Sequence, residues 1–483
     1  MSAQMPTDGR DPGAPAAPLR QLAELPGPAG WPLVGNLLQL EPARMHLQLA
    51  QWASTYGRFF RLRMGPTTVL VAADHAAVAA ALRERPDGFR RTLRQQRIAL
   101  EMGMKPGLFG AEGDAWRRQR RMVMAAFDPG HVSAYYPSLV RCGERLATLW
   151  HKAAASGRAV DLQADLMRFT VDAIAGLAFG TDVNTLGSDE NIIQRHLDKI
   201  FPKLFTRIIS PLPYWRWFKL PSDKALDVAL VEVNRAIDGF IAAARERLAD
   251  PARRAAPQNL LEAMIVAADE PGSGITDDQV SGNVMTMLLA GEDTTANTLA
   301  WAIWLLARHP EALARAQGEV RRVMAGGGPV TQEALAQLDY VEACMHETMR
   351  LRPVAPLLGL EALKDGVVGD VAVPTGTMVM ALMRHDSIDD QHVPEAKLFK
   401  PERWLGEGGY SPASAKRVSM PFGAGPRMCP GRYLALQEMK MVMVTLLDNF
   451  ELASVGTEDG SEPAERLMFA MAPVGLRMTL RAA

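Results

Sequence analysis

The stretch that most constrains this chain lies near its C-terminal end and reads Pro-Phe-Gly-Ala-Gly-Pro-Arg-Met-Cys-Pro-Gly-Arg, residues 421–432. Glycines and prolines in such quick succession predict a tight loop whose path is set by the backbone. An apolar run from Tyr433 to Leu447 follows and predicts a buried helix. Cys429 therefore precedes a helix N-terminus, where the dipole lowers the pKa of a thiol. A thiolate on a rigid loop suits a nucleophile or a metal ligand; the alternative is a buried cysteine before an ordinary helix.

The spacing Phe-x-x-Gly-x-Arg-x-Cys-x-Gly in this stretch resembles the haem-ligand loop of the cytochrome P450 family. The resemblance implies haem b as the cofactor and Cys429 as the axial ligand of its iron. It also implies that Arg427 neutralises a haem propionate. Further cofactor contacts are expected at Phe422, Gly423 and Gly431.

A long helix is predicted in the middle of the chain. Thr276 and Gln279 form a capping box at its start, and Pro310 stops it after Arg308. About thirty residues at about 1.5 Å each give a helix near 50 Å long, enough to cross a domain. Ala290-Gly291 is small enough for a flat ligand to approach the backbone. We expect this glycine and the nearby hydroxyls to loosen the helix locally and to free a carbonyl for water.

An acid–alcohol pair, Asp293-Thr294, follows those small residues. It resembles the oxygen-activation motif of the family, which makes Asp293 and Thr294 the candidate catalytic residues. Cleaving dioxygen needs two protons, and a carboxyl group beside a hydroxyl can deliver them without flooding the site. The alternative is a set of polar residues on a solvated helix face, which is possible for Glu292.

Trp116 and Arg120 are four residues apart on a predicted helix, so they share one face. An indole N–H and a guanidinium side by side can both donate to one buried carboxylate. The resemblance implies that this pair binds a haem propionate. Read alone, the spacing fits a packed ring beside a solvated charge.

The helix predicted over Leu338 to Leu351 carries Glu347 and Arg350, which are three apart and form a same-face ion pair. Arg403 comes later, after a loop. The resemblance implies that these three residues form a buried charge network. We expect this network to be structural, because buried ion pairs add registry more than net stability.

Two segments have the composition of loops or lids that cover a substrate pocket. Residues 92–113 read as a mobile apolar loop, and the resemblance places this region over the substrate pocket. Residues 195–225 hold prolines and aromatic residues between helices. This segment reads as a lid, and the alternatives are contact with a membrane surface or a packed connection. A C-terminal hairpin is predicted over 467–480. The pocket residues that we expect are all apolar: Met285, Leu288, Ala290, Val354, Leu357, Met471 and Ala472.

The net charge of −1 argues against general nucleic-acid binding. The three cysteines form no disulfide framework, so we expect a reducing compartment. Residues 1–24 read as a disordered tail, and 25–483 as one domain covered by the resemblance. No stretch has the apolar length of a membrane span. We therefore expect a soluble, cytoplasmic, monomeric protein of bacterial type. Its fold should be mainly α with a small β region, with haem between the central helix and the Cys429 helix.

The resemblance implies a monooxygenase that inserts oxygen into a lipophilic substrate by hydroxylation or epoxidation. No flavin or iron–sulfur motif is present, so a separate ferredoxin or flavodoxin, fed by an NAD(P)H-dependent reductase, is implied. An acidic donor is expected on a basic face formed by Arg117, Arg118, Arg121, Lys416, Arg417 and Arg432. Three alternatives stay open: a peroxide-driven haem-thiolate enzyme, a haem-binding sensor or carrier, and a helical protein without cofactor.

Overall fold

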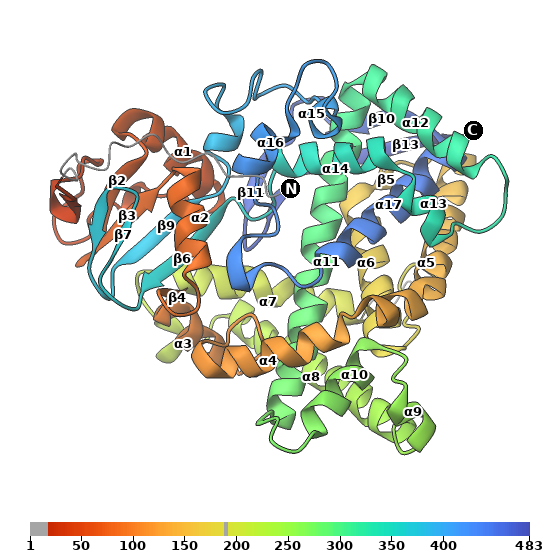
Figure 1. The fold of residues 1–483 in the computed structure, drawn as a ribbon, viewed down its shortest axis with the longest axis horizontal. Helices are drawn as coiled ribbons and strands as arrows, with labels where there is room; N and C mark the ends of the chain where they lie inside the picture. The colour runs from red at the N-terminus through yellow and green to blue at the C-terminus, as the bar shows by residue number, and fades with distance from the viewer. Residues whose placement is uncertain (1–17, 188–191) are drawn as a thin grey trace, which may run out of the picture.

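The computed structural model describes residues 18–187 and 192–483, which are coloured in Figure 1. Helices dominate this part of the chain, and four small sheets accompany them, so the predicted fold class is confirmed. The expected disordered tail falls largely on residues 1–17, which lie outside the described residues. Its described part holds strand β1, Arg20–Gln21, and a 3-10 helix, Leu22–Glu24.

The α-helices have the following bounds: α1 Met45–Tyr56, α2 His75–Arg83, α3 Leu93–Glu101, α4 Gly113–Ala126, α5 Pro129–Ser156, α6 Leu162–Phe179, α7 Ile192–Ile209, α8 Pro221–Arg247, α9 Pro251–Ala255, α10 Leu260–Asp269, α11 Asp277–Arg308, α12 Pro310–Met324, α13 Gln332–Ala336, α14 Asp339–Leu351, α15 Glu402–Leu405, α16 Pro412–Val418 and α17 Arg432–Asn449.

Besides β1, the strands are β2 Phe59–Met64, β3 Thr67–Ala72, β4 Phe89–Arg91, β5 Val160–Asp161, β6 Leu357–Ala362, β7 Gly366–Val368, β8 Val371–Val373, β9 Met378–Leu382, β10 Phe450–Gly456, β11 Glu465–Leu467, β12 Met471–Pro473 and β13 Arg477–Ala482. The largest sheet has the order β2-β3-β9-β6-β4 and lies with α1 and α2 on one side of the molecule (Figure 1). The smaller sheets are β1-β8-β7, β10-β13-β5 and β11-β12.

Helix α11 runs through the middle of the molecule (Figure 1). Its predicted capping box is present, because the Gln279 N–H donates to the Thr276 hydroxyl and the Thr276 N–H donates to the Gln279 side chain. The first half of α11, through Leu289, packs in one hydrophobic cluster with α4, α6, α8 and α10. The second half, from Ala296, packs in another cluster with α5, α14 and α17. The two cores are therefore separated on this helix by residues 290–295.

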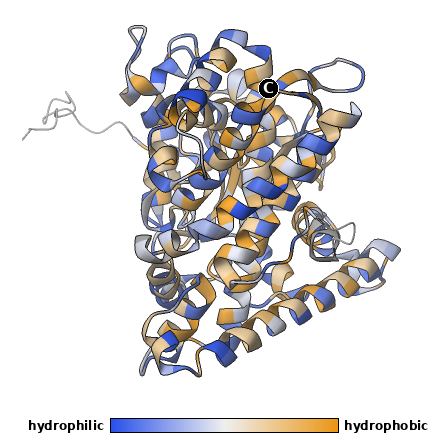
Figure 2. Cartoon of the chain, turned by 90° about the vertical axis from the view of Figure 1, so that its right-hand side faces the viewer, coloured by the Kyte–Doolittle hydropathy of each residue, from blue (hydrophilic) through white to orange (hydrophobic). Residues whose placement is uncertain are grey.

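The outer helices bury one face and expose the other. In α12, for example, Ala312, Ala316 and Val320 recur every four residues and are buried. Figure 2 shows the result as apolar and polar residues mixed along the helices that face the viewer. Among the described residues, no helix is both long enough and apolar enough to cross a bilayer.

Both predicted cover segments contain more helix than the sequence indicates. Residues 92–113 include α3, which the Thr92 side chain caps by accepting from the Gln95 N–H. Residues 195–225 begin inside α7, which continues through Pro202, and end in α8. Only a short connection with a 3-10 helix, Tyr214–Arg216, lies between them. The prolines predicted a more irregular backbone over 195–225 than the structure has, because packing between α7 and α8 keeps both segments helical.

The predicted C-terminal hairpin is wrong in its pairing. Strand β11 pairs with β12 around a turn at residues 468–470, whereas β13 pairs with β10 and β5. The small sheet expected over 371–380 is also divided, because β8 pairs with β1 and β7 while β9 joins the largest sheet. Strand partners far apart in sequence cannot be read from alternation alone.

Gly282 of α11 packs directly against Gly107, so even a methyl group at position 282 is expected to destabilise the fold. A Cβ on Gly282 of α11 would lie 2.6 Å from the Pro106 carbonyl carbon and 2.7 Å from the Gly107 nitrogen. We expect Gly282→Ala to lower the free energy of unfolding by about 1–3 kcal/mol through overpacking. Gly318→Ala is the control, because its Cβ would meet nothing within 4 Å inside α12. The control should be neutral or stabilising in denaturant unfolding, and equal losses in both variants would contradict the packing argument.

Candidate functional site

The loop that presents Cys429 depends on glycine. Gly425 has a φ of +71°, and a Cβ there would lie 2.7 Å from the Leu82 carbonyl oxygen of α2. The loop is closed by the Cys429 N–H, which donates to the Phe422 carbonyl oxygen at 2.9 Å. Gly423 is also in the left-handed region, with a φ of +75°. The loop therefore holds Cys429 in one position just before α17, as the sequence predicts.

The Cys429 side chain lies deep in the protein and still keeps open surface. Burial raises the pKa of the thiol and outweighs the opposing effects of the Gly431 N–H, which donates to Cys429, and of the Arg120 and Arg432 charges. The lowered pKa expected from the helix dipole is therefore wrong for the free thiol. A sulfur that is open to an interior space has the position that a metal ligand needs.

The break between the two cores of α11 coincides with the predicted ligand-contact position. Ala290 is exposed, although Leu289 and Glu292 on either side of it are buried. Because Glu292 is buried, the alternative that it lies on a solvated face of the helix is excluded. Gly291 has a different role from the one expected, because its Cβ would clash with Ile174 of α6 at 2.6 Å. It allows α6 to pack closely, and Ala290 alone offers the open surface.

The predicted local opening of α11 is wrong, because the helix is continuous from Asp277 to Arg308. The Thr294 hydroxyl donates to the Ala290 carbonyl oxygen at 2.7 Å. The Ala290 carbonyl is thus engaged by a side chain on the next turn. Thr294 nevertheless lies one turn from the exposed Ala290, on the same face of the helix.

Asp293 begins a chain of polar groups. Its Oδ1 accepts a hydrogen bond of 2.5 Å from Asn297 Nδ2, one turn along α11. Asn297 Oδ1 in turn accepts from Gln163 Nε2 of α6 at 2.8 Å. Gln163 is partly exposed, whereas Asn297 is buried. The carboxylate of Asp293 is therefore connected by side chains toward the edge of α6.

Glu438 is a candidate that the sequence reasoning missed. It lies on α17, nine residues after Cys429, and is 1 % exposed. Burial raises the pKa of this carboxyl group to about 8, and a hydrogen bond with Thr295 of α11 opposes the shift. Its Oε1 is buried without a hydrogen-bond partner. A neutral carboxyl group therefore lies beside the helix that carries Asp293 and Thr294, and apolar neighbours on α17 give no sequence signal for it.

The predicted propionate pair lies beside the Cys429 loop. Trp116 is buried, and the Arg427 guanidinium carbon lies 5.2 Å from the centroid of its ring. Burial and the Arg427 charge lower the pKa of Arg120, while the nearby Cys429 raises it. Trp116, Arg120 and Arg427 thus come together with Cys429, although α4 and the loop are about 300 residues apart.

Two further arginines join this cluster and were not predicted. The guanidinium groups of Arg85 and Arg427 pair with a single carboxylate, Glu112, which also accepts from the Arg91 backbone N–H. The Arg91 guanidinium lies near the same charges, so two positive charges are in excess. Burial, with the charge of Arg427, lowers the pKa of Arg85 to about 10. Arg85 Nε and Nη2 are buried and lack hydrogen-bond partners. Arg85 and Arg91 lie in an irregular segment after α2, where no spacing marks them.

The residues present fit haem. Unpaired buried donors and two excess positive charges suit a ligand that carries two carboxylates, as the propionates of haem b do. The sulfur of Cys429 and the side chain of Ala290 both keep open surface. A cofactor can therefore reach the sulfur that would bind its iron. Arg85, Arg91, Arg120, Arg427 and Trp116 would hold the propionates.

Glu347, Arg350 and Arg403 are fully buried and in contact. Arg350 donates to Glu347 through two nitrogens, at 2.8 and 2.7 Å, and Arg403 Nε donates to Glu347 Oε1 at 3.1 Å. Both guanidinium groups also donate to backbone carbonyls, which include those of Ala396 and Glu395. These bonds fix the meander between α14 and the Cys429 loop, in keeping with the structural role expected.

The predicted pocket residues are not all accessible. Met285 and Leu288 are buried in the cluster around the first half of α11, and Met471 is fully buried in β12. Val354, Leu357 and Ala472 are partly exposed. Phe469 lies in the turn between β11 and β12, and it was missed because the tip of the predicted hairpin was placed too far along the chain. The Met471 N–H donates to the Val354 carbonyl oxygen at 2.7 Å, which joins this hairpin to the segment after α14.

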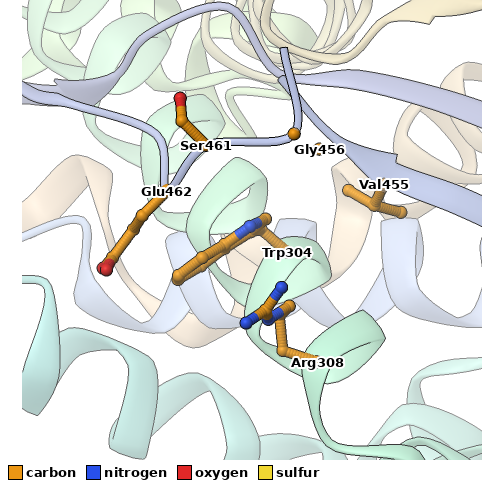
Figure 3. A pocket seen from close by; sticks show the side chains of 7 residues that line it. Trp304, Arg308, Val455, Gly456, Ser461 and Glu462 are labelled. Carbon is orange, nitrogen blue, oxygen red and sulfur yellow. The ribbon is translucent and has the colours of Figure 1, made fainter. Parts of the chain in front are cut away.

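A separate hollow of about 300 Å³ lies at the other end of α11 (Figure 3). Trp304 and Arg308 of α11 line it, together with Val455, Gly456, Gly460, Ser461 and Glu462. None of the residues described above contributes to this hollow. It is small and has no sulfur ligand, and its hydroxyl and carboxyl groups, from Ser461 and Glu462, are exposed.

Comparison with known proteins identifies the family. The family model described as Cytochrome P450 matches residues 25–480. The chain is 26% identical over 433 residues to the Protein LUTEIN DEFICIENT 5, chloroplastic, of Arabidopsis thaliana, with 87% of this chain and 71% of that protein covered. It is 28% identical to Cytochrome P450 97B2, chloroplastic, of Glycine max, over 86% and 80%. It is 29% identical to the Self-sufficient cytochrome P450 monooxygenase CYP505AG1 of Oidiodendron maius, over 89% of this chain and 40% of that protein.

Proposed function

The chain belongs to the cytochrome P450 family, and from that premise we propose that it oxidises a lipophilic substrate with electrons from a separate donor. As a member of this family it is a haem-thiolate monooxygenase and its cofactor is haem. The proposal concerns the substrate class, the donor and the residues that act. The observation that carries it is the open sulfur of Cys429 beside a buried arginine cluster with two unbalanced charges.

We assign Cys429 as the iron ligand and Arg85, Arg91, Arg120, Arg427 and Trp116 as propionate contacts. When bound, haem supplies dioxygen activation, and a thiolate ligand increases electron density for O–O cleavage. The Gly431 N–H, which donates to Cys429, favours the thiolate form. The glycine loop fixes the sulfur before the cofactor binds, so little reorganisation is needed.

We assign proton delivery to Asp293 and Thr294. Asn297, which is held by Gln163, orients the Asp293 carboxylate, and this carboxylate is the acid that takes up and releases the proton. The Thr294 hydroxyl, now donating to the Ala290 carbonyl oxygen, can turn to donate to the dioxygen substrate beside Ala290. Water is kept out by the apolar cluster around the first half of α11.

The substrate class follows from the same cluster. The cluster on this side of α11 is apolar, and the side chains at its edge that keep open surface include Met104, Met287 and Phe469. A site lined this way favours a lipophilic molecule, since a charged group would lose its hydration there without a partner. Hydroxylation or epoxidation of such a molecule is the proposed reaction.

The lid proposed over 195–225 is attached by polar contacts at its surface. Arg94 of α3 donates to the Ile208 carbonyl oxygen at 2.6 Å, and Glu101 accepts from Trp215 and Arg216 at 3.1 and 3.2 Å. Exposed ion pairs of this kind add little stability, so the contact can open at modest cost. Trp217 and Phe218 are also exposed, so the alternative of membrane-surface contact stays a prediction, as do the cytoplasmic location and the monomeric state.

The docking face for the donor needs revision at two positions. Arg117 is paired with Asp87 and Asp114, and the stem of Arg118 lies against Gly274 before α11. Arg121, Lys416, Arg417 and Arg432 are exposed. Arg432 is the most informative, because its charge acts on Cys429 while its side chain reaches solvent. We therefore centre the proposed docking face on Arg432.

The test is reconstitution of the holoprotein with a ferredoxin or flavodoxin, its reductase and NADPH, on lipophilic substrates chosen by their spin-state shift. We expect product, and we expect Arg432→Glu to slow the second-order reduction by about 3- to 10-fold at low salt, less at high salt. Arg235→Glu, on the exposed face of α8, is the matched control. Product formed with peroxide alone and not with the donor would reject the separate-donor proposal.

A further inference from the structure

Three phenylalanine rings from three separate elements meet in the structure. The rings of Phe201 and Phe469 are stacked, with centroids 4.1 Å apart and an interplanar angle of 4°. The ring of Phe109 lies 5.6 Å from that of Phe469. Phe201 belongs to α7, Phe469 to the turn between β11 and β12, and Phe109 to the connection between α3 and α4. Residues about 90 and 270 positions apart thus form one contact.

The position of this contact along α11 follows from a hydrogen bond. The Leu108 N–H donates to Asn283 Oδ1 of α11 at 3.0 Å, which attaches the connection next to Phe109. Asn283 and Ala290 are seven residues apart, so they lie on one face of α11, about 10 Å from each other. The connection that carries Phe109 is therefore attached to α11 about two helical turns before the open Ala290, and Phe201 and Phe469 pack against the first hydrophobic cluster.

The rings are not sealed in the core. Phe109, Phe201 and Phe469 are all partly exposed, while the cluster that they pack against is buried. The element that carries Phe201 is expected to move, because α7 belongs to the proposed lid. An aromatic contact of this kind shifts an equilibrium by about two- to twelvefold. Such a contact favours closure and still opens readily.

Phe109 is held in place by Arg91, a member of the arginine cluster. The Arg91 guanidinium carbon lies 3.5 Å from the centroid of the Phe109 ring, and Arg91 Nε donates to the Phe109 carbonyl oxygen at 2.6 Å. Phe109 is thus the fixed side of the contact. Phe201 and Phe469 form the movable side, since no cation lies over either ring among the described residues.

We propose that Phe109, Phe201 and Phe469 form an aromatic gate that determines which sizes of molecule reach the haem side of Ala290. The gate rests on the proposed placement of haem beside Cys429. Small molecules pass beside the stacked rings, whereas bulky ones must separate Phe201 from Phe469. The gate therefore sets substrate selectivity through the rate of entry.

The experiment measures binding of two iron ligands to the ferric holoprotein by stopped-flow absorbance. Imidazole is the small probe and clotrimazole, a triphenylmethyl imidazole, is the bulky one. We expect Phe469→Ala to raise the association rate of clotrimazole about tenfold and that of imidazole less than twofold. Phe201→Ala should have the same effect, and the double variant should add little, because both substitutions break one contact. Phe218→Ala is the control, since this exposed ring, on the connection between α7 and α8, lies outside the stack.

The outcomes separate the gate from the haem placement. An unchanged clotrimazole-to-imidazole rate ratio in both single variants would overturn the gate and leave the haem placement intact. A wild-type protein that gives no spectral shift with imidazole would overturn the haem placement, and the gate with it. Phe469→Leu, which keeps an apolar side chain, guards against misfolding and should give an intermediate rise in the clotrimazole rate.

Discussion

Replacing Cys429 by alanine is expected to abolish the thiolate-type spectrum of the reduced, carbon-monoxide-bound protein. The reason is that no other cysteine lies at the site, because Cys142 and Cys344 are both buried elsewhere. Product formation should fall on the order of 10³-fold or more, because the lost ligand acts in every turnover. Loss of the iron ligand weakens haem retention, so haem content is measured alongside the spectrum.

The other two cysteines provide matched controls. Burial raises the pKa of the Cys142 thiol to about 12 and that of Cys344 well above its usual value, so both behave as small apolar side chains. Cys142→Ala and Cys344→Ala should keep the thiolate-type spectrum and differ from wild type only in stability. If Cys429→Ala kept both the spectrum and the product, the assignment of the iron ligand would be wrong.

Local chemistry explains why part of the site was predictable. The Cys429 loop, the capping box at Thr276 and the Glu347–Arg350 pair each depend on residues within a few positions of one another. Glycine that must adopt a positive φ, a cap that satisfies a free N–H and an ion pair on one helix face all leave a pattern in sequence. These elements were therefore placed close to where the structure has them.

The missed residues depend on contacts between distant segments. Arg85 and Arg91 acquire their role only where the segment after α2 meets Glu112 and Arg427. Glu438 becomes a buried neutral acid only because α17 packs against Thr295 of α11. Phe469 was missed since strand pairing, which sets the hairpin turn, is not encoded in alternation alone. Long-range packing decided each case.

The second large effect is expected from Asp293→Asn. The amide keeps the shape of the carboxylate, and its oxygen can still accept from Asn297, so the fold and haem binding should not change. It cannot carry a proton, however, and donor-driven product formation should fall about 10²-fold. The solvent isotope effect on turnover should rise, because proton delivery becomes the slow step. Asp278→Asn is the control, as this carboxylate is exposed in the first turn of α11.

The same measurement decides between two proton paths through α11. One path starts at the carboxylate of Asp293, which Asn297 and Gln163 hold in place, and the other runs from Glu438 to Thr295. Glu438→Gln removes the second path, and we expect it to lower turnover less than Asp293→Asn does, because Glu438 Oε1 has no partner through which a proton could be replaced. If Asp293→Asn left turnover and isotope effect unchanged while Glu438→Gln lowered turnover about 10²-fold, protons would be delivered from the α17 side and Asp293 would be a structural residue.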